Sequence, residues 1–158
     1  MRRVREPKRP SRAQAVLFAC GQNAVRSPMA EALFRQMLGP ARRVASAGVS
    51  KGELDPFAVA AMAEIGIDIA EHRPTTLEEL EDWEELDFDL IVTLAPEAHH
   101  TALKLAPAVT AEVEYWATAD PTAIEGNREQ RLDAYRAVRD HLMERIRARF
   151  AATTGGNE

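Results

Sequence analysis

The sequence centres on the stretch Ala15-Val16-Leu17-Phe18-Ala19-Cys20-Gly21-Gln22-Asn23-Ala24-Val25-Arg26-Ser27-Pro28. Its first part is apolar at every position, which is typical of a strand buried on both faces. Its last residue is a proline, which fits the first turn of a helix because its fixed φ is already helical. The stretch therefore predicts a strand, a short loop and the start of a helix in direct succession.

Strand and helix patterns alternate through the rest of the chain. Apolar residues recur every four positions from Met29 to Met37, which predicts a helix over 28–38. The same patterns predict further strands over 43–47, 89–94 and 109–116, and further helices over 56–66, 96–105 and 127–150. Four strands alternating with helices predict an α/β fold: a four-stranded parallel sheet with helices on both faces, in a three-layer α/β/α arrangement of flavodoxin-like topology.

Two helix starts carry local signals of their own. Asp55 followed by Pro56 combines a residue that caps helices with a proline in the first turn. Thr76 with Glu79 three positions later has the spacing of a capping box, so a short acidic helix is predicted after it. Trp83, which stands among acidic residues, is predicted to anchor that helix by packing.

The length and composition fit one globular domain. The chain has 158 residues, of which 46% are hydrophobic and 28% charged, as is ordinary for a protein with a real core. We expect a domain over 14–150, a flexible basic tail over 1–13 and a frayed C-terminus over 151–158. The first twelve residues hold six Lys or Arg, although the net charge of the chain is −5. No nucleic-acid motif accompanies them, so we expect a solvated tail and no nucleic-acid partner.

Three absences narrow the class of protein. No apolar run approaches the roughly 20 residues of a membrane span, so no membrane partner is expected. A single cysteine, Cys20, excludes an intrachain disulfide and fits a reducing compartment, so we expect a cytoplasmic protein. His99 and His100 lack the further cysteine or acidic ligands of a zinc site, so no metal is expected.

The place of Cys20 gives the loop after it a chemical role. In such sheets the binding sites lie at the carboxyl ends of the strands. A loop between a strand and a helix N-terminus surrounds one point with backbone N–H groups, and the positive end of the helix dipole lies behind them. Such a concavity binds a tetrahedral oxyanion and stabilises the negative charge of a thiolate. Arg26, at the far end of the loop, can bind the same anion through two parallel hydrogen bonds.

With these residues the chain resembles the low-molecular-weight protein-tyrosine phosphatases and their arsenate-reductase relatives, over roughly residues 14–150. The most specific part is the pattern Cys-x5-Arg-Ser-Pro-Met-Ala-Glu from Cys20 to Glu31, directly after a strand. Further matches are Ser46-Ala47-Gly48, Gly66-Ile67-Asp68 leading into His72-Arg73, and Asp120-Pro121. The resemblance implies the same sheet fold and an enzyme that works without a metal or other cofactor.

The resemblance also implies a role for each matching residue. Cys20 is the nucleophile that takes the phosphoryl group, Arg26 stabilises the charge on its equatorial oxygens, and Asp120 protonates the leaving phenolate and then activates water. Ser27 hydrogen-bonds the cysteine sulfur. The phosphate is held by the loop residues Gly21, Gln22, Asn23, Ala24 and Val25 together with Arg26.

Ser46 and His72 match positions that orient Asn23 and Ser27 in this family. A purely structural pair is an equally good interpretation of these two residues, and both roles are compatible. Asn23 itself matches a position in the left-handed region, which asparagine tolerates better than most residues.

The chain departs from the phosphatase pattern in three places. A glycine often found two positions after the cysteine is replaced by Gln22, and the glycine stands one place earlier. A second cysteine often found before the arginine is replaced by Val25, so no protective disulfide can form. Tyrosines that follow Asp-Pro are replaced by Thr122 and Ala123, so that either aromatic packing on the substrate is weaker or Trp116 supplies it.

A fourth feature favours the arsenate-reductase branch. The run 92–98 looks more like that branch, but Ala95 stands where the branch places one of its relay cysteines. With one cysteine in the chain, arsenate reduction requires an external thiol.

The leading hypothesis is therefore hydrolysis of phosphotyrosine or small aryl phosphates through a phosphocysteine. The expected partners are a phosphorylated protein or a small aryl phosphate, and inorganic phosphate or a similar oxyanion. Two alternatives stay open: arsenate reduction with an external thiol donor, and a regulatory protein that binds an oxyanion without catalysis.

Overall fold

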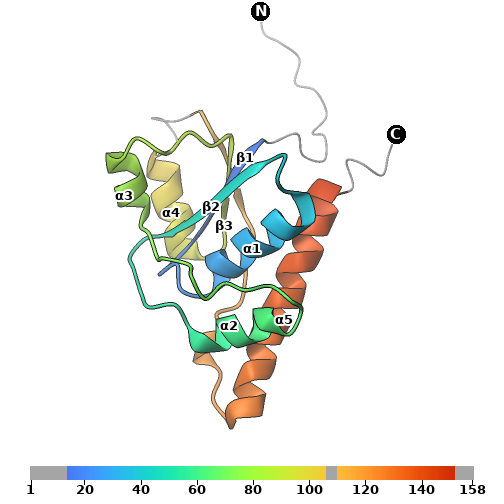
Figure 1. Cartoon of the computed structure of the whole chain (residues 1–158). Coiled ribbons are helices and arrows are strands. Elements are labelled where there is room, and N and C mark those ends of the chain that lie inside the picture. The colour runs from blue at the N-terminus through green and yellow to red at the C-terminus, as the bar shows by residue number, and fades with distance from the viewer. Residues whose placement is uncertain (1–13, 106–109, 152–158) are drawn as a thin grey trace, which may run out of the picture.

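The computed structural model describes residues 14–105 and 110–151. Its centre is a four-stranded sheet in the order β2-β1-β3-β4, in which every neighbouring pair of strands is parallel (Figure 1). The predicted α/β class and flavodoxin-like topology are confirmed, with the first strand in the interior of the sheet. The strands are β1 (Ala15–Cys20), β2 (Arg43–Gly48), β3 (Leu90–Thr93) and β4 (Glu112–Tyr115).

Some predicted segments reach beyond the described residues. The tail predicted over 1–13 lies outside them, and of the C-terminal stretch predicted over 151–158 only Ala151 lies inside. The strand predicted from residue 109 begins at Glu112.

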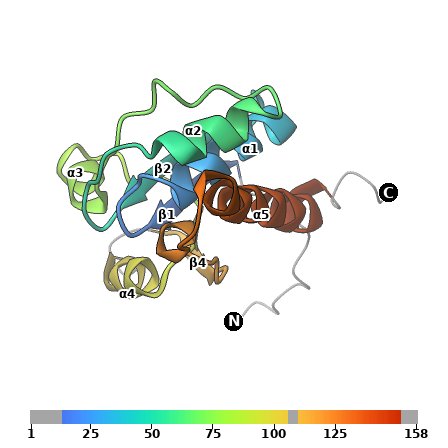
Figure 2. The ribbon, with the colours of Figure 1, turned by 90° about the horizontal axis from the view of Figure 1, so that it is seen from below.

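Helices cover both faces of the sheet, as Figures 1 and 2 show. One face is covered by α1 (Arg26–Leu38), α2 (Pro56–Ala63) and α5 (Arg128–Ile146), and the other by α3 (Leu77–Asp82) and α4 (Pro96–Leu105). Two short elements complete the order, η2 (Pro121–Ala123) and η3 (Arg147–Ala151), the second of which prolongs α5. Within the two described ranges, no helix is both long enough and apolar enough to span a bilayer.

The alternation of side chains along β1 accounts for the two covered faces. Val16 and Phe18 belong to the core on the α1–α2–α5 side. Leu17 and Ala19 belong to the core on the α3–α4 side, and all four side chains are fully buried. A strand held in this way from both sides fixes the position of its last residue, Cys20.

Two helices differ in length from the prediction. α1 begins at Arg26, two residues before the predicted start. Proline is tolerated throughout the first turn of a helix, where backbone N–H groups have no intrahelical acceptor, so Pro28 does not mark the first position. α2 ends at Ala63 although its pattern predicted a helix to 66, and Gly66, at φ 81°, closes the turn that follows.

The predicted capping signals are confirmed. The Asp55 carboxylate accepts the Phe57 N–H at 2.8 Å, and Thr76 and Glu79 form a reciprocal capping box at the start of α3. The prediction for Trp83 is wrong, because its side chain is 55% exposed. α3 ends one residue before it, and the side of the helix that faces the core is filled by Leu77 and Leu80.

Candidate active site

The loop between β1 and α1 is held by the segment 49–55. Four loop carbonyls, those of residues 20, 21, 22 and 24, accept backbone N–H groups of residues 49, 50, 52 and 55 at 2.9–3.1 Å. In a trans peptide the N–H of the next residue points away from the carbonyl. The N–H groups of residues 21, 22, 23 and 25 are therefore turned away from the segment 49–55, toward the inside of the loop.

Two glycines lie at close contacts of the loop, Gly48 against the backbone and Gly21 against a side chain. A Cβ on Gly48 would lie 2.7 Å from the backbone nitrogen of Asn23 and 2.6 Å from the carbonyl oxygen of Ser50. A Cβ on Gly21 would lie 2.6 Å from the Glu97 Oε2 atom. The shifted glycine of the loop, which has no Cβ, thus leaves room for the Glu97 side chain at the start of α4.

Cys20 is the last residue of β1, and the loop begins at it. Its side chain is 2% exposed, and its Sγ lies 2.9 Å from the Ser27 Oγ in the first turn of α1. The expected contact between Ser27 and the cysteine sulfur is therefore present.

Asn23 connects the loop to the rest of the site. It is fully buried, and its φ of 55° places it in the left-handed region, as its match to the family implied. Its Oδ1 accepts the backbone N–H of Thr75 at 2.8 Å, and because that group can only donate, the orientation of the amide is settled. Its Nδ2 then donates to Ser27 Oγ at 2.8 Å and to Ser46 Oγ at 3.0 Å.

The amide orientation sets the direction of the neighbouring hydrogen bonds. Ser27 Oγ accepts from Asn23, so its own proton is available to Cys20 Sγ at 2.9 Å. Ser46 Oγ likewise accepts from Asn23 and donates to Glu31 Oε1 at 2.5 Å. Asn23 thus leaves the Ser27 proton for Cys20 Sγ or for the Ala47 carbonyl, which lies 3.5 Å from Ser27 Oγ, and it leaves the Ser46 proton for a carboxylate.

His72 lies on the other side of Asn23. Its Nε2 is 3.0 Å from Asn23 Oδ1, which can only accept, so Nε2 carries the proton. Burial lowers the pKa of His72 below its usual value, although the charge of Glu31 and the contact with Asn23 act in the opposite direction. The imidazole is therefore neutral near pH 7. The structure brings Ser46 and His72 together around Asn23, where the resemblance placed them.

Sequence reasoning missed Glu31 and Thr75 as parts of this site. Glu31 binds Ser46 and lies 3.8 Å from His72 Nδ1. One signal was available, because Glu31 is four residues after Ser27 and so shares its helix face, which is otherwise buried. The contribution of Thr75 is its backbone N–H, which no residue type predicts.

The side chain of Arg26, the residue that ends the loop, lies close to that of Asp120. The Arg26 Nη1 donates to the Thr118 carbonyl at 3.0 Å, and Nη2 lies 4.0 Å from Asp120 Oδ2. The side chain of Arg26 is 12% exposed and that of Asp120 is 49% exposed, so the aspartate forms the open rim. The two residues, 94 positions apart in the sequence, therefore lie close together.

The environment of Asp120 favours its ionised form. Burial raises the pKa of the Asp120 carboxyl, but hydrogen bonds from the Thr122 hydroxyl and backbone N–H, together with the charge of Arg26, outweigh it. The pKa lies below its usual value, and without a bound anion the group is a carboxylate at neutral pH. The two hydrogen bonds measure 2.7 and 3.0 Å.

Trp116 does not replace the missing tyrosines. It is 2% exposed and packs against Phe18 with a ring centroid distance of 5.9 Å, so it belongs to the core. Its position in sequence next to β4 did not reveal that its ring turns inward.

No metal centre is present among the residues that the structure describes, where no three His, Cys, Asp or Glu side chains are grouped to hold an ion. His99 contacts the Thr93 hydroxyl at 2.9 Å and stacks on Tyr115 at a ring centroid distance of 5.1 Å.

Comparison with protein families identifies the class. The family model of the low molecular weight phosphotyrosine protein phosphatases matches residues 15–154, so the chain belongs to this family. An arsenate reductase from Bacillus licheniformis is 37% identical over 141 residues, covering 89% of this chain and 96% of the relative. An arsenate reductase from Halalkalibacterium halodurans is 38% identical over 143 residues, covering 89% and 96%.

Solved structures from both branches are similar. An arsenate reductase in the phosphate binding state is 26% identical, with a TM-score of 0.67 over 89% of this chain and 98% of the other. The YwlE arginine phosphatase, in a mutant with a phosphorylated active site serine, is 27% identical, with a TM-score of 0.66 over 84% and 91%. The tyrosine phosphatase amsI of Erwinia amylovora, at 24% identity and a TM-score of 0.68 over 85% and 89%, supports the fold alone.

Proposed function

We propose that this protein hydrolyses aryl phosphate monoesters, with phosphotyrosine as the class of natural substrate, through a phosphocysteine. The observation that carries the proposal is the placement of Asp120 4.0 Å from Arg26, the residue that ends a loop whose N–H groups turn inward. A phosphoryl group in the loop is then in reach of a nucleophile from below and a carboxyl group from above, as displacement in line requires.

The residues divide the reaction into two displacements. In the first, the Cys20 thiolate bonds to phosphorus, the bond to the phenolic oxygen breaks, and Asp120 gives that oxygen its proton. In the second, the Asp120 carboxylate takes a proton from water, whose oxygen displaces the sulfur and releases phosphate. Arg26 and the loop N–H groups stabilise the charge on the equatorial oxygens in both steps.

The lowered pKa of Asp120 in the empty site fits this sequence of roles. A phosphate dianion in the loop neutralises Arg26 and places negative charge beside Asp120, and both effects raise the pKa of the carboxyl. The group is therefore a better acid when substrate is bound. After the phenol has left, the same carboxylate is in place to accept a proton.

The test is turnover of p-nitrophenyl phosphate. We expect Cys20→Ser to abolish it and Arg26→Ala to reduce kcat/KM by about 10²-fold or more. Asp120→Ala should slow phenyl phosphate much more than p-nitrophenyl phosphate, because a poor leaving group depends on its acid. Wild-type activity equal to that of Cys20→Ser would reject the proposal, and an equal loss with both esters would remove Asp120 as the acid.

A second candidate, arsenate reduction, is favoured by the names of the relatives that are 37–38% identical. Since the chain has one cysteine, a thiol from outside must attack the sulfur of Cys20 in its adduct with arsenate, so that a mixed disulfide forms, the S–As bond breaks and its electron pair reduces As(V) to arsenite. Arsenite formation with glutathione, mycothiol or a glutaredoxin as donor would support this reaction. No arsenite with any of the three donors would exclude it.

A further inference from the structure

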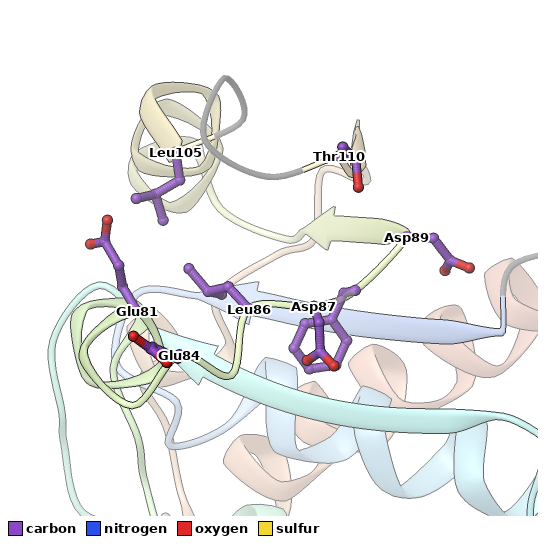
Figure 3. Close-up of a pocket in the computed structure, with 8 residues that line it drawn as sticks. Glu81, Glu84, Leu86, Asp87, Asp89, Leu105 and Thr110 are labelled. Atoms are coloured by element: carbon purple, nitrogen blue, oxygen red, sulfur yellow. The ribbon is translucent and has the colours of Figure 1, made fainter.

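One cavity, of about 520 Å³, is lined by the carboxylates of Glu81, Glu84, Asp87 and Asp89 together with apolar side chains (Figure 3). Another lies between the N-terminal turns of α2 and α5 and is joined to the loop through Asp55. It has a volume of about 360 Å³ and is lined by Asp55, Pro56, Phe57, Arg128 and Arg131. Figure 2 shows the two helices side by side on the same face of the sheet. None of these residues takes part in the proposed displacement steps.

Two guanidinium groups stack on one aromatic ring in this cavity. The Cζ of Arg131 lies 4.7 Å from the centroid of the Phe57 ring, and that of Arg128 lies 5.4 Å from it. The ring is itself held by Tyr135, with ring centroids 5.2 Å apart and planes 29° apart. Stacking of this kind restrains an exposed guanidinium and leaves its N–H groups free for a ligand.

The two arginines differ from others on the same helix. Arg136 and Arg139 both bind Glu64 at 2.7–3.0 Å. In the part of the chain that the structure describes, no carboxylate lies within 4.0 Å of the guanidinium of Arg128 or Arg131. Neither charge therefore has an ion-pair partner among the described residues, in a chain whose net charge is −5.

The one carboxylate in the cavity is already engaged. Asp55 accepts the Tyr135 hydroxyl at 2.6 Å on one oxygen and the Phe57 N–H at 2.8 Å on the other. The charge on Asp55 also helps to raise the pKa of Tyr135, so that this hydroxyl keeps its proton and its hydrogen bond. The cavity therefore offers two cationic donors against one carboxylate that is already bound.

Asp55 also joins the cavity to the proposed phosphate site. Its backbone N–H donates to the carbonyl of Ala24 in the loop at 3.1 Å. Its partner Tyr135 lies near enough to Asp120 for that charge to act on its pKa. The cavity and the phosphate loop are therefore neighbours, joined through Asp55 and Tyr135.

We propose that this cavity binds the carboxylate of an acidic residue close to the phosphorylated residue of a protein substrate. The inference rests on the proposed function and narrows it to phosphoproteins with acidic surroundings. A carboxylate fits because its two oxygens match the paired N–H groups of a guanidinium. A neutral or basic neighbour gains nothing from the two arginines, and a basic one is repelled.

The experiment compares three phosphotyrosyl peptides that differ only in their flanking residues, which are glutamate, glutamine or lysine. The wild type, Arg131→Gln and Arg128→Gln are measured with each peptide and with p-nitrophenyl phosphate. Lys104→Gln, which removes an exposed charge from α4 on the opposite face of the sheet, is the matched control. Both arginines are exposed, and circular dichroism and thermal unfolding confirm that each variant is folded.

We expect the wild type to prefer the glutamate peptide over the glutamine peptide by about three- to tenfold in kcat/KM at low salt, as two exposed ion pairs allow. Each arginine variant should lower this ratio and Lys104→Gln should leave it in place, while Arg131→Glu should turn the preference toward the lysine peptide. High salt should reduce the wild-type ratio.

Equal ratios in the wild type, both arginine variants and the control would overturn the inference, and so would a wild-type preference for the glutamine peptide. If p-nitrophenyl phosphate is hydrolysed in either case, the proposed function stands and the cavity alone is misassigned. If the wild type does not turn over p-nitrophenyl phosphate, the proposed function fails and the inference falls with it.

Discussion

Replacement of Asn23 by alanine is the most direct test of the site's architecture. Its side chain makes four hydrogen bonds of 2.8–3.0 Å while fully buried, and two of them hold the hydroxyls of Ser27 and Ser46. The other two satisfy N–H donors of Thr75 and His72. Alanine removes all four bonds and leaves these donors without their acceptor.

The expected loss of stability follows from these contacts. A hydrogen bond contributes about 0.5–1.5 kcal/mol net, so four account for about 2–6 kcal/mol. The backbone φ of 55° adds about 1 kcal/mol for alanine, because a Cβ without a local hydrogen bond is strained there. We expect Asn23→Ala to lower the free energy of unfolding by about 5 kcal/mol, which is a large part of the roughly 5–15 kcal/mol of a typical domain.

The assay is urea unfolding with and without phosphate, scored by the midpoint at an unchanged m value. Asn23→Gly loses the same bonds without the left-handed strain, so it should cost less than Asn23→Ala. The control is Asn127→Ala, which removes an exposed cap of α5 and should cost about 1 kcal/mol. If Asn23→Ala costs no more than Asn127→Ala, the network around Asn23 does not stabilise the loop and the reasoning is refuted.

Three further predictions concern the surroundings of the loop. Thr122→Val removes the 2.7 Å hydrogen bond from the Thr122 hydroxyl that helps to lower the pKa of Asp120, so this pKa should rise. The alkaline limb of the pH profile of kcat/KM for phenyl phosphate should then move to higher pH, and a limb that stays in place or moves to lower pH would contradict this. Gly48→Ala forces a Cβ to within 2.7 Å of the backbone nitrogen of Asn23, so we expect the free energy of unfolding, measured in urea, to fall by about 1–3 kcal/mol and kcat/KM to fall with it. Unchanged values of both would show that the loop moves aside without cost. Peroxide should inactivate the protein at Cys20, and dithiothreitol should restore activity only early in the exposure, since no second cysteine is present to trap the sulfenic acid. Glutathione added with the peroxide should keep the inactivation reversible. Irreversible oxidation of Cys20 in the presence of glutathione, detected by mass spectrometry, would contradict this.

The fold was predictable because its signals are local. The apolar run of β1, the helix period after Pro28 and the caps at Asp55 and Thr76 each act over a few residues, and each formed as predicted. The alternation of strands and helices then left few topologies, since parallel strands need crossover connections. The errors lie at helix ends and at Trp83, where a short helix offers too little buried surface for a tryptophan.

The site was predictable only in part, because its decisive contacts join distant segments. The strand–loop–helix order indicated an anion site at Cys20 and Arg26. That Asp120 lies near Arg26, 94 positions away in the sequence, depends on the pairing of β4 with β3 and on the packing of α5 against η2 and α1. The backbone donors of segment 49–55 and of Thr75 carry no side-chain signal, so a sequence cannot reveal them.

The two reactions considered for this chain share their first half, and this explains why relatives with either name are similar to it. Phosphate and arsenate are both tetrahedral oxyanions, and the same loop and guanidinium suit both. The reactions separate at the second step, where hydrolysis needs a base for water and reduction needs another thiol. In the proposed mechanism Asp120 serves as that base, whereas Ala95, where the resemblance places a relay cysteine, is 1% exposed within the apolar core on the α3–α4 side. This chain has a carboxylate for hydrolysis and a buried alanine where a second thiol would be needed for reduction. Hydrolysis can therefore use the chain's own residues, whereas reduction depends on a second molecule, and we place hydrolysis first.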